Sequence, residues 1–311
     1  MTNEPARPSP SLIIAYCDYS YRGSPNTDPL LLAASIRRYG GACKSVPIWL
    51  MCRDIPDMFA QISKKATALN VDLLPYKNDV NIADFPFARK GIAAAEAERR
   101  AEGEAAELLW FDRDSLVLND VSPLLLRPDK NVSFRPVNVQ NIGEEAGTGP
   151  EGNRSGFWRR ACELAGADYG ALGTTTGYID RKVLLFYIAA GLVGVRPELG
   201  IFREWERLLR AFAADRFLQG YCEEHSIYKI FMHQAALSIA VAGKIGVGER
   251  QELPTLAMYP LNFWEDDPNA CRPTTLDDLI SLRYDTVLDD EDWLRFPMSA
   301  ELRNWLRDNI R

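Results

Sequence analysis

The segment Leu108–Leu118 reads LLWFDRDSLVL, an apolar run that ends in two aspartates, Asp112 and Asp114, separated by one residue. A continuous apolar run of this length is typical of a central strand that is buried on both faces of a sheet. In open α/β sheets, ligands bind in the crevice beyond the carboxyl ends of the strands. We therefore expect the acidic pair at a ligand-binding edge, where two hard anionic oxygens suit Mg²⁺ or Mn²⁺ together with phosphate oxygens and water.

An Asp-x-Asp (DXD) string alone also occurs in many solvated turns. In that alternative interpretation Asp112 caps a turn, Asp114 is solvated and Arg113 pairs with one of them. The buried-strand context favours the ligand site over the solvated turn.

Upstream of this strand, strand-like and helical segments alternate. Helices are expected from Asp28 to about Tyr39 and from Ile55 to Leu69. Alternation of this kind predicts a parallel sheet with right-handed crossovers. The predicted fold class is α/β, with a mostly parallel central sheet flanked by helices on both faces. The segments expected to be neighbouring parallel strands are Leu12–Cys17, Val46–Cys52, Val71–Pro75 and Leu108–Phe111.

The remaining chain continues the α/β pattern. Strands are expected at Val132–Val137 and Tyr187–Val195, and helices at Phe87–Gly103, Gly156–Leu164, Ile201–Ala214 and His233–Ala242. The glycine-rich segment Asn138–Asn153 is expected to be a mobile lid or simply disordered. The tail from Thr274 to Arg311 is expected to be rich in helix. We expect a single domain over 1–311, with a nucleotide-binding half at 11–120, an acceptor half at 121–270 and a helical tail at 271–311.

Composition limits the possible functions. The 311 residues are 47% hydrophobic and 25% charged, which argues against disorder. The formal net charge of −7 disfavours nucleic acid and anionic membranes as the main partners. The six cysteines are scattered and none lies at zinc-ligand spacing with a histidine, as expected for free thiols in a reducing cytoplasm. The N-terminus is unlike a signal peptide and no apolar run reaches the roughly 20 residues of a membrane span, so we expect a cytoplasmic protein.

Four segments, in order, resemble the GT-A fold family of nucleotide-diphospho-sugar glycosyltransferases. They are the loop YCDYSYRGSP after the first strand, the segment FPFARK that leads a helix into LLWFDRDSLVL, the strand YIAAGLVGV, and HQAALS followed later by YPLNFW. The resemblance extends over roughly Leu12 to Trp264. The order in which the four segments occur along the chain carries the resemblance.

The resemblance implies an enzyme that moves a sugar from a nucleoside-diphosphate sugar to an acceptor, which could be a glycan, a lipid or a protein. In this family a divalent cation, Mn²⁺ or Mg²⁺, bridges the two phosphates and acts as a Lewis acid. By this resemblance Asp112 contacts the ribose and metal-bound water, and Asp114 ligates the metal. Asp18 and Tyr19 would hold the base and ribose, and Lys90 would approach the diphosphate or the acidic pair.

Three positions in the matching segments need comment. Ala189 stands where the family has a sugar-contacting Asn, and His233 stands where it has an Asp. His233 could ligate the metal or only serve as a structural residue. Gly191 lies inside a strand, which often marks close approach of the backbone to a ligand or a neighbour, so we include it among the cofactor-binding candidates.

The catalytic base is a separate question. An inverting transferase needs a carboxylate near the acceptor hydroxyl, and Glu265, Asp266 and Asp267 are candidates. The alternative is a solvated acidic turn before Pro268. A competing function is a non-catalytic nucleotide-sugar-binding or scaffold protein with a decayed active site, motivated by Ala189 and His233.

Overall fold

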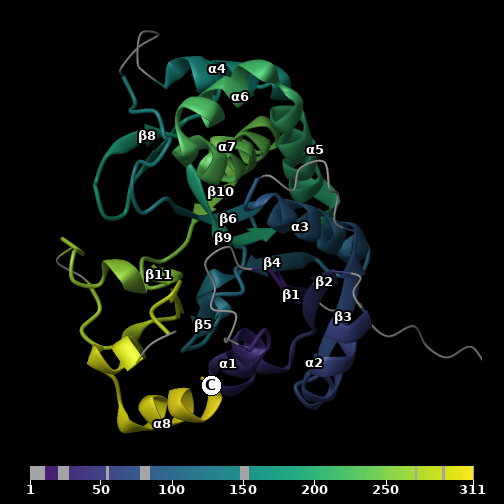
Figure 1. Ribbon diagram of the computed structural model, residues 1–311, viewed down its shortest axis with the longest axis vertical. Coiled ribbons are helices and arrows are strands. Elements are labelled where there is room, and N and C mark those ends of the chain that lie inside the picture. The colour runs from purple at the N-terminus through teal and green to yellow at the C-terminus, as the bar shows by residue number, and fades with distance from the viewer. Residues whose placement is uncertain are drawn as a thin grey trace, which may run out of the picture.

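The computed structural model describes residues 11–19, 28–53, 56–77, 85–147, 154–269, 272–288 and 291–310. Its centre is a seven-stranded sheet in the order β10-β6-β9-β4-β1-β2-β3 (Figure 1). The strands are β1 (Leu12–Cys17), β2 (Ile48–Arg53), β3 (Val71–Tyr76), β4 (Glu107–Phe111), β6 (Val132–Pro136), β9 (Ile188–Val195) and β10 (Arg250–Glu252).

The sheet is mostly parallel, as the sequence predicts. β4 pairs in parallel with β1, β1 with β2, and β2 with β3, so the four strands predicted to be parallel neighbours are confirmed. β9 is the exception, because it runs antiparallel to both β4 and β6. The α/β class predicted from the sequence is correct.

Helices cover both faces of the sheet because its central strand is apolar on both sides. Side chains alternate along a strand, so Leu108 and Trp110 of β4 enter one core while Leu109 and Phe111 enter the other. The Trp110 face packs against α3 (Ala88–Ala101), α4 (Ser155–Ala165), α5 (Ile201–Ala214) and α7 (Ser226–Lys244). The other face packs against α1 (Leu31–Tyr39) and α2 (Pro56–Ala68).

A smaller sheet follows directly from the end of β4. Its strands are β11 (Tyr259–Pro260), β12 (Ser281–Arg283) and β5 (Ser115–Val117), with β12 antiparallel to β5. This arrangement brings the C-terminal segment back to the residues that follow the central strand. The chain then ends in α8 (Ala300–Asn309), which lies near α1 in Figure 1, where Trp305 meets Tyr39 edge to face with ring centroids 5.4 Å apart.

Several expectations need correction. The C-terminal tail is not rich in helix: its described part contains β12, short 3₁₀ turns and α8 alone. The helix expected at His233–Ala242 begins earlier, at Ser226, and a further helix, α6 (Arg216–Glu224), precedes it. A hairpin of β7 (Thr174–Thr176) and β8 (Val183–Leu185) was also missed. These elements are short or lack a clear apolar period, so the pattern does not reveal them.

The segment expected to be a lid is packed against the protein over its described part. Ile142 and Glu144 are buried, and Glu145 forms an isolated bridge with Leu184 of β8. Residues 148–153 of the same segment lie outside the described residues. Among the described helices, none combines the length and apolar character needed to cross a bilayer.

The start of α5 is capped by a residue from another helix. The residue before α5, Gly200, has no side chain to cap it and lies in the left-handed region at φ 64°. Glu98 of α3 supplies the missing acceptor: its carboxylate accepts hydrogen bonds from the backbone N–H groups of Phe202 (3.0 Å) and Arg203 (2.8 Å). These are the donors that a helix leaves unpaired at its N-terminus. Glu98 thereby fixes α3, the helix that carries Lys90, against α5.

Replacing Glu98 should destabilise the fold strongly. Glu98→Ala leaves the buried N–H of Phe202 and the partly buried N–H of Arg203 unpaired and removes a fully buried carboxylate, so we expect a loss of about 3 kcal/mol in the free energy of unfolding. Urea denaturation followed by circular dichroism measures this loss. Glu102→Ala is the matched control, because Glu102 also pairs with Arg203 but is 45% exposed, and its loss should stay within about 0.5 kcal/mol. Equal losses in the two variants would contradict the capping role.

Candidate functional site

The acidic pair lies where the sequence places it, at the carboxyl end of β4. Asp112 and Asp114 are each 4% exposed, so the alternative of a solvated turn is wrong. The backbone N–H of Asp112 donates to the carbonyl of Gly191 on the neighbouring strand β9 at 2.6 Å. Lys90, in the first turn of α3, forms an ion pair through Nζ with Asp112 Oδ1. The sequence analysis expects Lys90 near either the diphosphate or the acidic pair, and the structure shows the contact with the acidic pair.

A second cation, Arg283, reaches the acidic pair from the end of β12. Its Nη1 lies 3.8 Å from Asp112 Oδ2, its Nε 3.4 Å from Asp114 Oδ2, and its Nη2 2.8 Å from Asp285 Oδ1. The sheet register explains this position, because Arg283 pairs with Ser115 and Tyr284 N–H donates to the carbonyl of Asp114 at 3.0 Å. Sequence analysis missed Arg283 and Asp285, since nothing local in the SLRYD segment connects it to β4.

The absence of a side chain at Gly191 makes room for the acidic pair. A Cβ there would lie 2.4 Å from the terminal methyl of Met258 and 3.0 Å from Asp112 Oδ2. Asp112 Oδ2 is buried and has no hydrogen-bond partner among the described residues. Gly191 therefore serves close approach of a neighbour, which is one of the two meanings expected of a glycine in a strand; its predicted contact with a cofactor stays a prediction.

Burial and charge shift the proton affinities of this cluster in predictable directions. Burial raises the pKa of Asp112 above its ordinary value, and the cations of Lys90 and Arg283 offset only part of that rise. Burial alone would lower the pKa of Arg283, but the carboxylates of Asp114, Asp285 and Asp112 outweigh it, so the pKa of Arg283 ends above its ordinary value. Arg283 is therefore a permanent cation at this site.

Asp18 ends up at the same edge of the sheet, but its carboxylate is already engaged. It follows β1, and its backbone carbonyl accepts a hydrogen bond from Arg113 at 2.8 Å. Its two carboxylate oxygens accept from Arg53 Nε at 3.1 Å and from the Tyr76 hydroxyl at 3.2 Å. Tyr19 beside it has the Arg89 guanidinium 5.2 Å from its ring centroid. The predicted contacts of Asp18 and Tyr19 with a nucleotide stay predictions.

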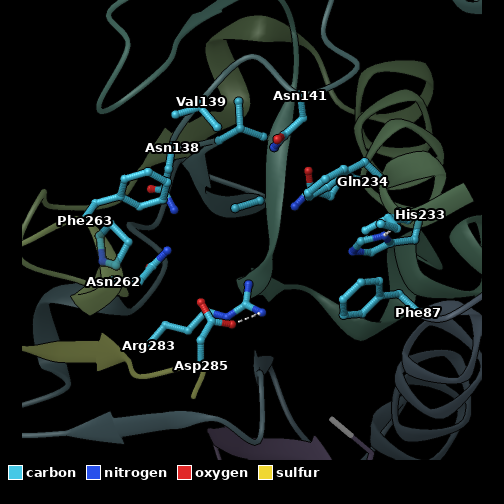
Figure 2. Close-up of a pocket in the computed structure, with 15 residues that line it drawn as sticks. Phe87, Asn138, Val139, Asn141, His233, Gln234, Asn262, Phe263, Arg283 and Asp285 are labelled. Atoms are coloured by element: carbon cyan, nitrogen blue, oxygen red, sulfur yellow. Dashed lines mark hydrogen bonds and ion pairs between the residues drawn. The ribbon is translucent and has the colours of Figure 1, made fainter. Parts of the chain in front are cut away.

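A pocket of about 200 Å³ opens beside this cluster (Figure 2). Figure 2 shows amide side chains of Asn138, Asn141, Gln234 and Asn262 directed toward its centre, with the Arg283–Asp285 ion pair at one end. Its volume is below the 300–1,000 Å³ typical of drug-sized ligands, so it suits one small polar ring. The lining residues are Phe87, Val137, Asn138, Val139, Asn141, Ala189, Ile230, Phe231, His233, Gln234, Pro260, Asn262, Phe263, Arg283 and Asp285.

Helix α7 contributes two polar side chains to the pocket. Gln234 is 7% exposed, and its Oε1 has no hydrogen-bond partner among the described residues. Buried polar atoms normally have a partner, so an unpaired acceptor on a residue that lines the pocket is unusual. The His233 ring stacks on Phe87, with centroids 4.4 Å apart, and its Nδ1 lies 2.9 Å from the carbonyl of Ile230. Since a carbonyl only accepts, Nδ1 carries the proton.

The acidic residues near the C-terminal end of the fold do not lie in the pocket. Asp267 is 5% exposed and accepts hydrogen bonds from the hydroxyls of Tyr178 (3.0 Å) and Tyr259 (2.9 Å). It holds the segment together and has little capacity left to act as a base, and Glu265 and Asp266 are exposed. Among the described residues lining the pocket, Asp285 alone carries a carboxylate.

The residues at this site do not fit the Mn²⁺ or Mg²⁺ centre expected from the sequence. Lys90 takes one oxygen of Asp112, and Arg283 faces the other oxygen and Asp114. His233 lies with its ring against Phe87 and its Nδ1 against a carbonyl. Within the part of the chain that the structure describes, no group of three or more His, Cys, Asp and Glu side chains is arranged to hold a metal ion. The ligand set Asp112, Asp114 and His233 is therefore not assembled.

Comparison with known proteins identifies a family. The family model described as the Rhodobacterales glycosyltransferase domain matches residues 22–244. This span covers well over half of the chain and contains the acidic pair, Lys90, His233 and Gln234. Arg283 and Asp285 lie beyond it. A comparison with curated proteins found no match.

Solved glycosyltransferase structures also align with the chain, at low identity. They include the galactosyltransferase LgtC in complex with donor and acceptor sugar analogues (12% identity, 88% of this chain and 86% of that chain, TM-score 0.46). Mouse xyloside xylosyltransferase 1 aligns at 10% identity over 88% of this chain and 96% of that chain, with a TM-score of 0.44. GlyE of Streptococcus pneumoniae TIGR4 aligns at 14% identity over 98% of this chain and 61% of that chain, with a TM-score of 0.46.

The neutral state of His233 predicts a specific dependence of stability on pH. Burial, and then the charge of Lys90, lower the pKa of His233 well below the usual 6.5. Below pH 6.5 the unfolded chain therefore gains a proton that the folded chain lacks. Relative to a variant without this imidazole, the wild type should lose up to about 1.4 kcal/mol of unfolding free energy per pH unit.

Urea unfolding of the wild type and His233→Gln at pH 7.5, 6.5 and 5.5 measures this relative loss. The difference in unfolding free energy between the two proteins should change by about 1 kcal/mol between pH 6.5 and pH 5.5. His225→Gln is the control, because His225 is exposed and is the other histidine of the chain. A difference that does not change with pH would show that His233 is not held neutral.

Proposed function

Because this chain belongs to the Rhodobacterales glycosyltransferase domain family, we propose that it transfers one sugar from a nucleoside-diphosphate sugar to an acceptor that is a glycan, a lipid or a protein. The donor sugar binds in the pocket of Figure 2. The diphosphate lies toward Arg283 and the strand ends. The acceptor hydroxyl approaches from the open side.

The observation that carries this proposal is the pairing of an amide-rich pocket with a fixed guanidinium. Amide groups both donate and accept hydrogen bonds, so Asn138, Gln234 and Asn262 can match the hydroxyls of a sugar ring. A guanidinium matches phosphate oxygens in the same way that it matches carboxylates. The two lie in one pocket at the carboxyl edge of the sheet, where α/β proteins bind their ligands.

Gln234→Leu tests the sugar pocket directly. The unpaired Oε1 makes no hydrogen bond within the described protein, so its removal should leave thermal stability unchanged or slightly raised. If Oε1 accepts a hydroxyl of the donor sugar, kcat/KM should fall about tenfold or more, since a hydrogen bond in such a site contributes roughly 1–3 kcal/mol. The measurement is release of free sugar or transfer from a panel of nucleoside-diphosphate sugars.

Gln219→Leu on α6 is the control, because Gln219 does not line the pocket and its side chain bonds to the carbonyl of Phe212 alone among the described contacts. Its kcat/KM should equal that of the wild type. Binding of a sugar nucleotide without hydrolysis or transfer would favour the non-catalytic alternative. Failure of every sugar nucleotide to bind would refute the proposed function.

A further inference from the structure

We propose that Arg283, supported by Lys90, is a built-in cation that replaces a divalent metal at the Asp112–Asp114 pair, so that a nucleoside diphosphate binds here without a metal ion. This inference rests on the proposed function and names the group that receives the diphosphate. Its experiment includes a measurement that is independent of any donor.

The guanidinium of Arg283 lies where a shared metal ion would have to sit. Three of its nitrogens face three carboxylates: Nη1 faces Asp112 at 3.8 Å, Nε faces Asp114 at 3.4 Å, and Nη2 faces Asp285 at 2.8 Å. A metal bridging Asp112 and Asp114 would have to displace this side chain. The antiparallel pairing of Arg283 with Ser115 holds the backbone of Arg283 beside the acidic pair, so the position of this cation is fixed by the pairing of β12 with β5.

The other oxygens of the pair are also occupied or enclosed. Lys90 takes Asp112 Oδ1, and its side chain is only 5% exposed, so loss of this partner would leave a buried ammonium without an anion. Asp112 Oδ2 makes no hydrogen bond among the described residues, but Arg283 Nη1 lies 3.8 Å from it. The backbone of Gly191 is close on another side, because a Cβ there would lie 3.0 Å from the oxygen. Neither the guanidinium nor the Gly191 Cα can complete a coordination shell for a hard cation.

Each carboxylate at this edge already contacts a basic side chain. Arg53 pairs with Asp18. Lys90 pairs with Asp112, and Arg283 lies within ion-pair distance of Asp112, Asp114 and Asp285. Protein cations therefore occupy the positions around these carboxylates that a divalent ion would need.

Arg283 is the cation within reach of a ligand. Its side chain is 25% exposed and lines the pocket, whereas Lys90 is only 5% exposed and does not line it. Lys90 is therefore a positioning residue, which pairs with Asp112 Oδ1 and leaves Arg283 as the cation that a phosphate meets at the pocket wall. A guanidinium binds phosphate oxygens through two parallel N–H bonds and keeps its charge at every accessible pH.

The first experiment measures metal binding to the protein alone. Titration of the wild-type protein with Mn²⁺, with free Mn²⁺ followed by electron paramagnetic resonance, should show no stoichiometric site. Stoichiometric binding of Mn²⁺ that is lost in Asp114→Asn would overturn the proposal, whatever the donor turns out to be.

The second experiment measures nucleotide binding by calorimetry with UDP, GDP, CDP, dTDP and ADP, in EDTA and in Mn²⁺. At least one diphosphate should bind the wild type in EDTA, with an affinity that Mn²⁺ changes less than threefold. Arg283→Gln should lower that affinity at least tenfold, and Arg283→Lys, which keeps the charge, should lower it less. Arg160→Gln, which removes an arginine paired with Asp215 away from the pocket, is the control and should bind like the wild type.

These outcomes separate the two proposals. Binding of a diphosphate only when Mn²⁺ is present would overturn the built-in cation while supporting the proposed function. Unchanged affinity in a folded Arg283→Gln variant would also overturn the built-in cation while supporting the proposed function. No binding of any diphosphate in either condition would refute the proposed function and, with it, the role of Arg283. If circular dichroism shows that Arg283→Gln is unfolded, the affinities of the wild type in EDTA and in Mn²⁺ still show whether diphosphate binding needs a metal ion.

Discussion

The buried carboxylate of Asp112 is the constraint on which the site depends. Strand β4 is covered on both faces, and its last residue delivers Asp112 into an environment where an unpaired charge is strongly unfavourable. The cations that compensate it come from distant parts of the chain: Lys90 from α3, and Arg283 from a strand that pairs with β5. Closing this cluster therefore requires that the large sheet, α3 and the small sheet all reach their final positions together.

The same closure builds the pocket. Gln234 and His233 come from α7, Asn138 and Asn141 from the segment after β6, and Arg283 from β12. No two of these elements are adjacent in the chain, so the pocket exists only once the C-terminal segment has returned to the end of β4. The family match ends at residue 244, and the structure shows that residues beyond it complete one end of the pocket.

Sequence alone predicts the features that depend on local pattern. The predicted positions of the central strands were correct because each is a mainly apolar run between turn signals. Such a run is stable when it is buried inside a sheet. The position of Asp112 and Asp114 followed from the strand that precedes them. Arg283 could not be found in this way for two reasons. Its partner Asp114 lies 169 positions away in the chain. Its strand, β12, has three residues and is too short to show the alternation of apolar and polar side chains that identifies a strand. The two tyrosine contacts of Asp267 could not be predicted for a related reason: the sequence of an acidic turn is the same whether its carboxylate is free or accepts hydrogen bonds from distant hydroxyls.

A guanidinium differs from a metal ion in how it shares its charge, and this difference shapes donor binding in the mode that we propose. A divalent ion arrives with open coordination positions, whereas Arg283 is already hydrogen-bonded or ion-paired to carboxylates before any ligand enters. In the proposed mode a diphosphate competes with Asp114 and Asp285 for the same N–H groups, so the net free energy of phosphate binding is less favourable than the contact itself. In that mode most of the discrimination between donors comes from the sugar, which meets the amide groups of the pocket. Gln234 contributes the clearest example that we propose, because its Oε1 has no hydrogen-bond partner among the described residues and a sugar hydroxyl would supply one.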